Sequence, residues 1–476
     1  MNNFEKSQTR ISELTSYSAS ALVKLISNHS VSPVEVMAAH LAIIDQLNPK
    51  LNAIVTIAPD LIERAREAEA AVMRGHGLGP LHGLPVTIKD TIETAGLRTT
   101  SGSLRRADFV PVMDAPAVAR LKKAGAIVLG KTNPAEMAME YTAENPVFGR
   151  TNHPLDGSLT PGGSSGGEAA AIASCMSPCG LGTDLAGSIR IPAHFCGIVG
   201  LKPTAAVVPG EGQFPPSTGP YSLGASIGPM ARGVEDLRLL FDVMSGNEGS
   251  PTGVIEAERR SLAGCRVAWY TDDGVTPVID ETRLTVRTAA SALSQAGLLV
   301  VEQRPPAIER GHELWLKLFS RASVVQLRNL YQDHEDQGGD FVRWRLGKAV
   351  NEKPPTLDEY IGWWMERDKL RDELLGWMKD TPLLIAPVGA TAAFAHGTHK
   401  LTVADQTIST FRAFSYCQTF NVFDLPVVTV PAGRSSEGLP IGVQIVGPPF
   451  AEETVLTAAA IVEQALGGWC MQNRER

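Results

Sequence analysis

The sequence predicts an α/β fold in which helices are layered against parallel strands. The segment LPVTIKD (84–90) is rich in β-forming residues and predicts a short buried strand that ends at a charged pair. The segment APAVARLKKAG (115–125) predicts a helix that stops at Gly125, and AIVLG (126–130) predicts a second buried strand. Alternation of strands and helices along the chain is typical of layered α/β proteins.

The chain before these strands is predicted to be helical, and one helix start is well marked. Ser32 can cap the helix, Pro33 suits its first turn, and Glu35 completes a capping box. The apolar periodicity runs to Asn48 and Pro49, where we expect this helix to end.

Further helices and strands are expected in the rest of the chain. A second helix is expected from about Pro59 to Met73, followed by a glycine-rich break at 75–83. Residues 304–380 carry five tryptophans in charged helical sequence and predict an inserted helical segment. The remaining elements are expected strands at 382–387, 425–433 and 440–447, a hairpin turn at 435–438 and a closing helix at about 452–466.

The composition narrows the classes of partner. The 476 residues carry a formal net charge of -8, without any dense Lys/Arg block, so we expect no nucleic-acid or membrane partner. A small neutral ligand fits this charge better. The first twenty residues hold no apolar run, and no stretch of about 18 apolar residues occurs, which predicts a cytoplasmic protein.

The six cysteines are scattered, which favours reduced thiols over a disulfide framework. Cys175 and Cys179 have the spacing of a zinc-ligand pair, but no second Cys or His pair accompanies them. We therefore expect buried structural cysteines and no metal.

Two loops of small residues carry the candidate chemistry. In LTPGGSSGGEAAA, four glycines surround Ser164 and Ser165 ahead of a helix, whose N-terminus favours negative charge. In GLGTDLAGSIRIP, Ser188 follows small residues and precedes IRIP, which is predicted to be a strand. A nucleophilic serine needs nearby N–H donors for the oxyanion, and the run Leu185, Ala186, Gly187 and Ser188 can supply that hole.

A nucleophilic serine also needs a base, and no histidine has a persuasive setting. No G-x-S-x-G elbow surrounds Ser188, and His153, His194 and His396 lie in loop sequence. Lys89, at a strand end, is the remaining candidate, because burial disfavours the charged form of an amine. The residues alone leave open an alternative in which Lys89 is simply paired with Asp90.

The segment GAIVLGKT, from Gly125 to Thr132, matches the P-loop pattern by its letters. A phosphate loop must lie between a strand and a helix, whereas here the intervening residues are themselves the expected strand. We therefore interpret the match as accidental. Lys131 begins a polar segment, which runs to Asp156 and could line a cleft.

Three separated motifs, GLPVTIKD, PGGSSGGEAAAIA and GLGTDLAGSIRIPAHFCGIVGLKPT, closely resemble those of the amidase signature enzymes. The resemblance runs nearly continuously over 59–232, and LPVVTVPAG and GLPIGVQIVGPPFAEE are similar to the closing strands of that family. It implies one amidase domain over 1–476, with a signature core at 59–232 and a variable helical segment at 304–380 that lines the substrate cleft. The implied fold has a large mixed, mostly parallel sheet covered by helices on both faces.

The resemblance also implies a Ser-Ser-Lys triad, with Ser188 as nucleophile, Ser164 as proton relay and Lys89 as base. A cis peptide bond is implied between Gly163 and Ser164. The implied reaction is hydrolysis of an amide to a carboxylate and an amine or ammonia through an acyl-enzyme, without metal or organic cofactor.

Supporting roles follow from position in the motifs: Thr183 and Asp184 would brace the loop 185–189, which carries Ser188 and is called the nucleophile loop, and Arg190 would hold its far side. The chain departs from the commonest pattern at Ala186 and Asp424, where a glycine is usual. The first departure could tighten the oxyanion loop, and the second puts the local loop shape in question.

Two further classes stay open. The chain could be the glutaminase subunit of a glutamine-dependent tRNA amidotransferase, although 304–380 does not resemble what we expect of such subunits. A nucleotide-binding protein that uses 125–132 is the third class. For the amidase, the loop at 133–152 and the segment 304–380 are expected to line the pockets, with aromatic content that favours an apolar or aryl group. A homodimer is one expected assembly.

Overall fold

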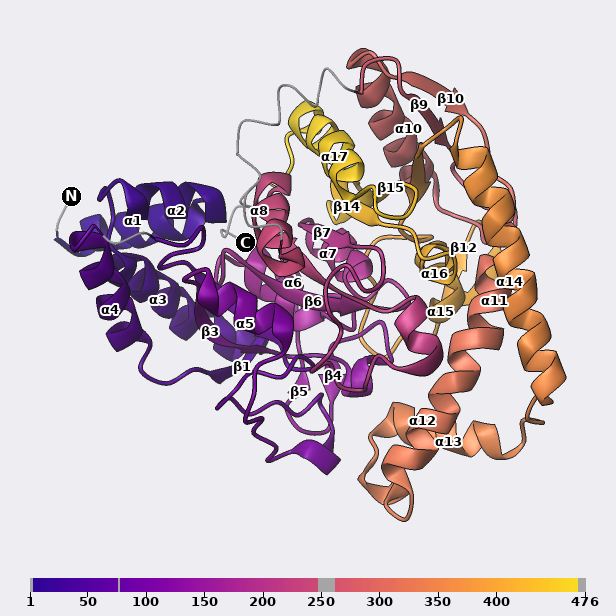
Figure 1. Ribbon diagram of the computed structural model, residues 1–476, viewed down its shortest axis with the longest axis horizontal. Helices are drawn as coiled ribbons and strands as arrows, with labels where there is room; N and C mark the ends of the chain where they lie inside the picture. Colours follow the sequence, from indigo (N-terminus) through magenta and orange to yellow (C-terminus); the bar gives the residue numbers. More distant parts are fainter. Residues whose placement is uncertain (1–2, 76–77, 247–261, 470–476) are drawn as a thin grey trace.

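The protein is built around one large twisted sheet (Figure 1). The computed structural model describes residues 3–75, 78–246 and 262–469. Within these ranges, eleven strands form the sheet in the order β1-β3-β2-β6-β8-β7-β14-β15-β11-β9-β10. The strands are β1 (Ile54–Ile57), β2 (Pro85–Lys89), β3 (Ile127–Thr132), β6 (Cys179–Asp184), β7 (Val199–Lys202), β8 (Ser226–Ala231), β9 (Arg266–Trp269), β10 (Leu299–Glu302), β11 (Leu383–Pro387), β14 (Val427–Arg434) and β15 (Pro440–Val446).

The sheet is mixed, as expected, but the expectation that it is mostly parallel is wrong. Only β3–β2, β2–β6, β11–β9 and β9–β10 pair in parallel. The pairs β1–β3, β6–β8, β8–β7, β7–β14, β14–β15 and β15–β11 are antiparallel. The reason is that β8 lies between β6 and β7 with the opposite direction, and that the predicted turn at 435–438 joins β14 and β15 in a hairpin.

Helices cover both faces of the sheet, as expected. Alternate residues of β11 show this, because side chains of a strand point to opposite faces: Leu383 and Ile385 join the core beneath α8, α10 and α17, whereas Leu384 and Ala386 join the core beneath α7 and α16. The helices are α1 (Asn3–Ser16), α2 (Ala19–Ser27), α3 (Pro33–Leu51), α4 (Leu61–Met73), α5 (Pro116–Lys123), α6 (Gly166–Ala173), α7 (Arg190–Cys196), α8 (Val234–Ser245), α10 (Asp280–Gln295), α11 (Gly311–Trp315), α12 (Arg321–Tyr331), α13 (Asp340–Val350), α14 (Leu357–Met378), α15 (Thr410–Ala413), α16 (Ser415–Val422) and α17 (Glu452–Leu466).

Two smaller hairpins stand apart from the main sheet. They pair β4 (Glu144–Asn145) with β5 (Gly149–Arg150), and β12 (Lys400–Val403) with β13 (Gln406–Ser409). The helices α11 to α14, from the 304–380 segment, lie along one side of the molecule, opposite the helices α1 to α4 (Figure 1).

Two local predictions are wrong. The helix α3 continues past Pro49 to Leu51, and Asn52 ends it in a left-handed conformation with a φ of 51°. Pro49 has no N–H to donate to the preceding turn, but the helix end is still closed by the N–H of Asn52, which donates to Asn48 O at 2.7 Å. The IRIP segment is not a strand but the first turn of α7. Proline suits a first helical turn. The strand was predicted because the two isoleucines are β-branched, a feature that favours strands.

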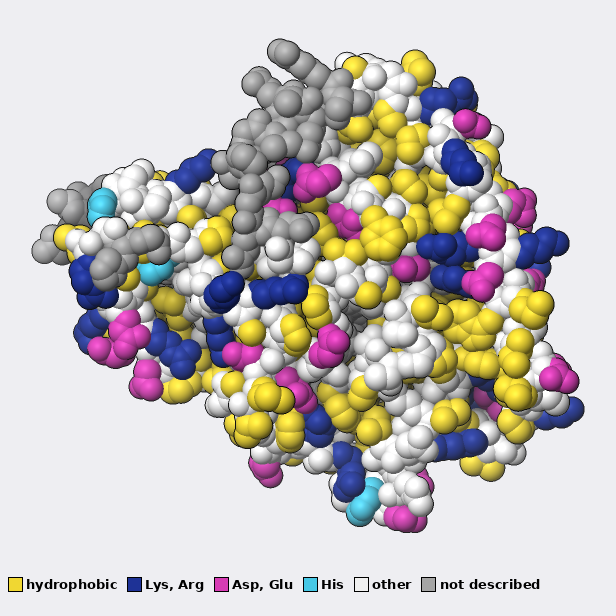
Figure 2. Space-filling view, viewed as in Figure 1, with side chains coloured by type: hydrophobic (Ala, Val, Ile, Leu, Met, Phe, Trp, Pro, Cys, Tyr) yellow, Lys and Arg dark blue, Asp and Glu magenta, His cyan; other side chains and the backbone are white. Residues whose placement is uncertain are grey.

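The surface mixes charges of both signs on the face that Figure 2 shows. Among the helices of the described ranges, none is both long and apolar enough to cross a bilayer.

The predicted capping box is present and can be tested. Ser32 Oγ accepts the N–H of Glu35 at 3.0 Å, and Glu35 Oε2 accepts the N–H of Ser32 at 2.9 Å. Ser32→Ala should lower the free energy of unfolding by about 1 kcal/mol, since it leaves an N–H of the first turn without its cap. Urea denaturation measures this change. Ser30→Ala is the matched control, because the Ser30 side chain is exposed; equal losses in both variants would show that the cap contributes nothing.

Candidate active site

The glycine-rich loop before α6 lies directly against the backbone of the segment 133–152. A Cβ on Gly163 would lie 2.0 Å from the carbonyl oxygen of Thr142, and one on Gly167 would lie 2.5 Å from the backbone nitrogen of Asn133. Only glycine allows these approaches. The expected cis peptide bond between Gly163 and Ser164 is present. The loop therefore holds Ser164 at the start of α6 through backbone contacts.

Lys89 ends strand β2 with its side chain fully buried. Its Nζ lies 2.6 Å from Ser164 Oγ and 2.7 Å from Thr183 Oγ1. The alternative pairing with Asp90 does not occur, because Asp90 Oδ2 instead accepts the backbone N–H and the hydroxyl of Thr100. Two hydroxyls, rather than a carboxylate, are the neighbours of this amine.

The surroundings of Lys89 favour its neutral form. Burial lowers the pKa of Lys89 to about 7, although the charges of Asp184 and Glu168 oppose this shift. Glu168, on α6, accepts hydrogen bonds from the hydroxyls of Thr87 and Thr132, and burial raises its pKa to about 7. The amine can thus gain and lose a proton near neutral pH.

Ser188 lies in the loop between β6 and α7, with 5% of its surface exposed. The N–H of Ser165 donates to the carbonyl oxygen of Ser188 at 3.1 Å, so the two serine loops are joined by their backbones. Gly187 has a φ of 108°, and a Cβ there would lie 2.6 Å from Cys417 Cβ. The glycine therefore lets the nucleophile loop turn tightly against α16.

A buried ion pair braces this loop. Arg190 donates from Nε to Asp184 Oδ2 at 3.0 Å and from Nη2 to Asp184 Oδ1 at 2.8 Å. Burial raises the pKa of Asp184, but the adjacent Arg190 charge outweighs it and holds that pKa well below its usual range. Gln444 Oε1 accepts a hydrogen bond from Nη1 of Arg190, and Asn421 Oδ1 accepts one from Nη2. The carboxylate in turn accepts the N–H groups of Gly187 and Ile189.

This arrangement reduces the number of donors available for an oxyanion. The N–H of Gly187 is already donated to Asp184 Oδ1 at 2.9 Å. Within the described residues, the N–H groups of Leu185, Ala186 and Ser188 make no hydrogen bond. The expected four-residue hole therefore has three free donors.

Ala186 and Asp424 stand where a glycine is usual in the amidase signature pattern, and the structure accommodates them in different ways. Ala186 does not have a positive φ, so an alanine fits there without strain. Asp424 does have a positive φ, of 51°, a conformation that favours glycine. Its Oδ1 accepts the N–H of Ala205 at 2.8 Å and lies 3.7 Å from Lys202 Nζ. The Asp424 carboxylate thus provides a partner for the N–H of Ala205 and for the Lys202 ammonium group, which a glycine could not do.

The three histidines considered as bases are not placed for that role. His153 binds the carbonyl oxygen of Phe195 and the N–H of Leu155, and His194 binds Thr391 O and the N–H of Gly442. Burial lowers the pKa of each to about 4. In the described part of the chain, His396 makes no hydrogen bond to Ser164 or Ser188.

The P-loop match and the cysteine pair have structural explanations. Lys131 and Thr132 belong to strand β3, and Lys131 donates to Ile92 O and to Thr94 Oγ1. Cys175 and Cys179 are free and buried, and the described residues contain no cluster of His, Cys, Asp and Glu suited to a metal ion. Cys470 lies outside the described residues.

The sequence did not predict the polar contacts of Glu168, Asn421 and Gln444 at the site, nor the hydrogen bonds by which Tyr141 and Trp315, from the two segments expected to line the pockets, hold the loop. Two of these residues could have been recognised from the sequence. Glu168 begins an alanine-rich helix and Gln444 interrupts an apolar strand, and a buried polar residue in such a setting requires a partner.

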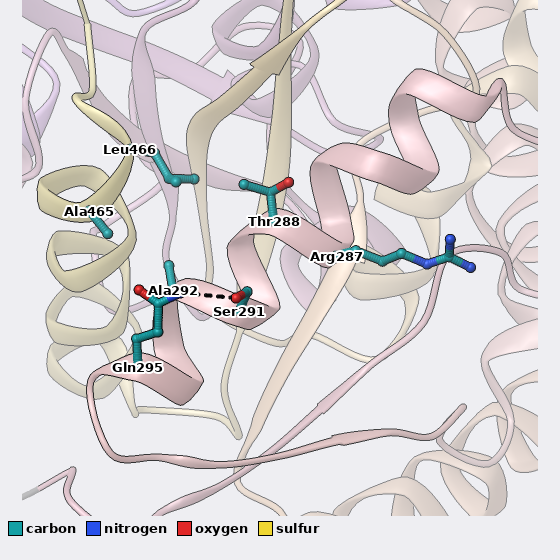
Figure 3. A pocket seen from close by; sticks show the side chains of 7 residues that line it. All are labelled: Arg287, Thr288, Ser291, Ala292, Gln295, Ala465 and Leu466. Carbon is teal, nitrogen blue, oxygen red and sulfur yellow. Dashed lines mark hydrogen bonds between the residues drawn. The ribbon is translucent and has the colours of Figure 1, made fainter.

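A surface hollow of about 290 Å³ lies elsewhere, between α10 and α17 (Figure 3). None of the candidate site residues lines it. The residues around it are Arg287, Thr288, Ser291, Ala292, Gln295, Ala465 and Leu466, and Gln295 donates to Ser291 within it.

Comparison with known proteins agrees with the sequence motifs. A family model described as "Amidase" matches residues 35–456. Fatty-acid amide hydrolase 2 of Homo sapiens is 31% identical over 485 residues, which cover 94% of this chain and 88% of that protein. A glutamyl-tRNA(Gln) amidotransferase subunit of Sulfurihydrogenibium sp. is 30% identical over 483 residues, with 94% and 96% covered.

Among solved structures, a bacterial aryl acylamidase of the amidase signature family superposes with a TM-score of 0.82 at 26% identity. The match covers 94% of this chain and 96% of that one. The chain therefore belongs to the amidase signature family, whose members are hydrolases that act on amide carbon–nitrogen bonds.

The buried Asp184–Arg190 pair yields a stability prediction. Arg190→Gln should lower the free energy of unfolding by about 3–5 kcal/mol, because it leaves a buried carboxylate without its counter-charge. Arg283→Gln is the matched control, since the Arg283–Asp272 pair is partly exposed and should contribute below about 1 kcal/mol. Chemical denaturation of both variants gives the comparison. Similar losses would argue against a special role for the buried pair.

Proposed function

We propose that the protein hydrolyses an amide to a carboxylate and an amine or ammonia, with Ser188 as nucleophile, Ser164 as relay and Lys89 as base. One observation carries this proposal. Lys89 Nζ, buried and without a carboxylate partner, lies 2.6 Å from Ser164 Oγ. A lysine whose neutral form is accessible near pH 7 can accept a hydroxyl proton.

The proposed reaction begins when neutral Lys89 takes a proton from Ser164, which takes one from Ser188. Ser188 Oγ then attacks the carbonyl carbon, and the oxyanion is stabilised by the free N–H groups of Leu185, Ala186 and Ser188. The proton returns through Ser164 to the leaving nitrogen, which departs poorly unless it is protonated. Water then hydrolyses the acyl-enzyme along the same proton path.

Thr183, Asp184 and Arg190 support these steps in the proposal. Thr183 Oγ1 fixes the position of Lys89 Nζ, and the Asp184–Arg190 pair fixes the loop that carries Ser188. Gly163 supports Ser164 through its close approach to Thr142. The scheme uses no metal and no organic cofactor.

We propose that the segments 133–152 and 304–380 line the substrate cleft and favour an apolar or aryl group. Aromatic side chains from both segments meet at the nucleophile loop, where Phe411 packs 4.9 Å from the Tyr141 ring and 5.0 Å from the Trp315 ring, between centroids. Aromatic surfaces favour apolar substrate groups. The names of two relatives, a fatty-acid amide hydrolase and an aryl acylamidase, point in the same direction.

The similarity to amidotransferase subunits supports a second candidate function, that of the glutaminase subunit of a glutamine-dependent tRNA amidotransferase. The identity of the Sulfurihydrogenibium protein to this chain, 30%, is within one percentage point of that of the human fatty-acid amide hydrolase. Glutaminase activity that requires tRNA and co-purifying partner chains would support this candidate. Hydrolysis of aryl or fatty amides by the isolated chain would support the independent amidase.

Replacing the nucleophile tests the proposal directly. Ser188→Ala should abolish amide hydrolysis, a loss of at least about 1000-fold, because no other group can form the acyl-enzyme. Product formation from a panel of aliphatic, aryl and fatty amides measures it, with the melting temperature as the check on folding. Ser177→Ala is the control, because Ser177 is buried and its hydroxyl makes, among the described residues, a single hydrogen bond, to Cys179 O. Full activity of the Ser188 variant would refute the proposal.

The lowered pKa of Lys89 predicts how the rate depends on pH. The amine must be neutral to act as a base, so kcat/KM should be constant above a pH of about 7 and should fall about tenfold per unit below it. Initial rates between pH 5 and 9 measure the profile, and return of each sample to pH 8 checks that the enzyme survived. A profile that is level down to pH 5 would exclude Lys89 as the base.

A further inference from the structure

The carbonyl groups of the nucleophile loop determine where its N–H groups point. In a trans peptide the carbonyl of one residue and the N–H of the next point in opposite directions. A donor that holds the carbonyl on one side of the loop therefore aims the following N–H toward the other side.

Each carbonyl in this loop has a donor. Asn421 Nδ2 lies 3.5 Å from Asp184 O, Trp315 Nε1 donates to Leu185 O at 2.9 Å, and Tyr141 Oη donates to Ala186 O at 2.8 Å. The N–H of Ile191 donates to Gly187 O at 2.7 Å, within the first turn of α7.

The four peptide units are not held equally. The unit between Ala186 and Gly187 is bonded at both ends, to Tyr141 and to Asp184. The unit between Leu185 and Ala186 is held by a hydrogen bond only at its carbonyl, by Trp315, because the N–H of Ala186 makes no hydrogen bond among the described residues. The direction of this free N–H therefore depends on the Trp315 indole.

Trp315 is itself held firmly. It ends α11 with 7% of its surface exposed, and its ring packs against Phe411 and Phe319 at centroid distances of 5.0 and 6.3 Å. Helix α11 lies directly on α16, since a Cβ on Gly311 would come within 2.1 Å of Thr419 Oγ1. The indole N–H thus has a fixed position relative to the nucleophile loop.

We propose that Trp315 is a positioning residue that aims the N–H of Ala186 at the oxyanion. This inference rests on the proposed function. It assigns a part in turnover to the segment 304–380, which lies outside the signature core. A hydrogen bond on the carbonyl also polarises the peptide unit and strengthens its N–H as a donor. The N–H of Ala186 should stabilise the transition state, in which negative charge develops on the substrate oxygen, and should contribute only weakly to substrate binding.

The test removes the indole N–H and compares kcat with KM. In Trp315→Phe, kcat for an amide should fall about five- to tenfold, as for loss of one hydrogen bond, with KM nearly unchanged. Affinity for a substrate-like aldehyde, which forms a tetrahedral adduct with an oxyanion on Ser188, should fall by a similar factor. Trp269→Phe is the matched control, because Trp269 lies in β9, away from the loop, and should keep wild-type values.

A second variant covers the case in which the smaller phenyl ring disturbs folding. Replacement of Trp315 by 3-benzothienylalanine keeps a bicyclic ring of similar shape and exchanges the N–H donor for sulfur, and the same losses are expected. Wild-type kcat and aldehyde affinity in this isostere, or a change confined to KM, would overturn the inference. Failure of the proposed function is recognised separately, because Ser188→Ala would then retain activity.

Discussion

The buried pair of Asp184 and Arg190 is the interaction on which the site depends most. Its carboxylate ends β6 and accepts two N–H groups of the nucleophile loop, while its guanidinium starts α7 and reaches Gln444 in β15 and Asn421 in α16. Taking two charges out of water is costly, and this geometry offsets the cost because nearly every donor and acceptor of the pair is bonded. One ion pair thus holds, through hydrogen bonds to its backbone, the turn that carries Ser188.

Lys89 is also buried, but unlike Arg190 it has no carboxylate in direct contact. Its closest polar neighbours are hydroxyl oxygens, and the carboxylates of Asp184 and Glu168 act on it without a direct contact. A direct partner such as Asp90 would keep the ammonium form, which could not serve as the proposed base. The fold instead binds Asp90 to Thr100, which leaves the amine poised between its two protonation states.

Much of the local structure could be predicted from the sequence, because it depends on neighbouring residues. The strand at 84–90, the strand that excludes a phosphate loop after Gly125 and the cap at Ser32 follow from patterns a few residues long. The direction of the strands could not be predicted, since β8 is placed between β6 and β7 by pairing across the sheet. The partner of Lys89 stayed open for the same reason. Trp315 and Asn421 were missed because they reach the nucleophile loop across 130 and 237 positions of the chain.

The close fit of the glycine-rich loop against 133–152 has a consequence for recombination between relatives. Thr142 and Asn133 contact Gly163 and Gly167 by backbone atoms, at positions where a single added carbon has no space. The two segments therefore form one matched unit, although they are separate stretches of the chain. Chimeric enzymes assembled from members of this family need crossover points before residue 133 or after residue 167, so that the two backbones are always inherited together.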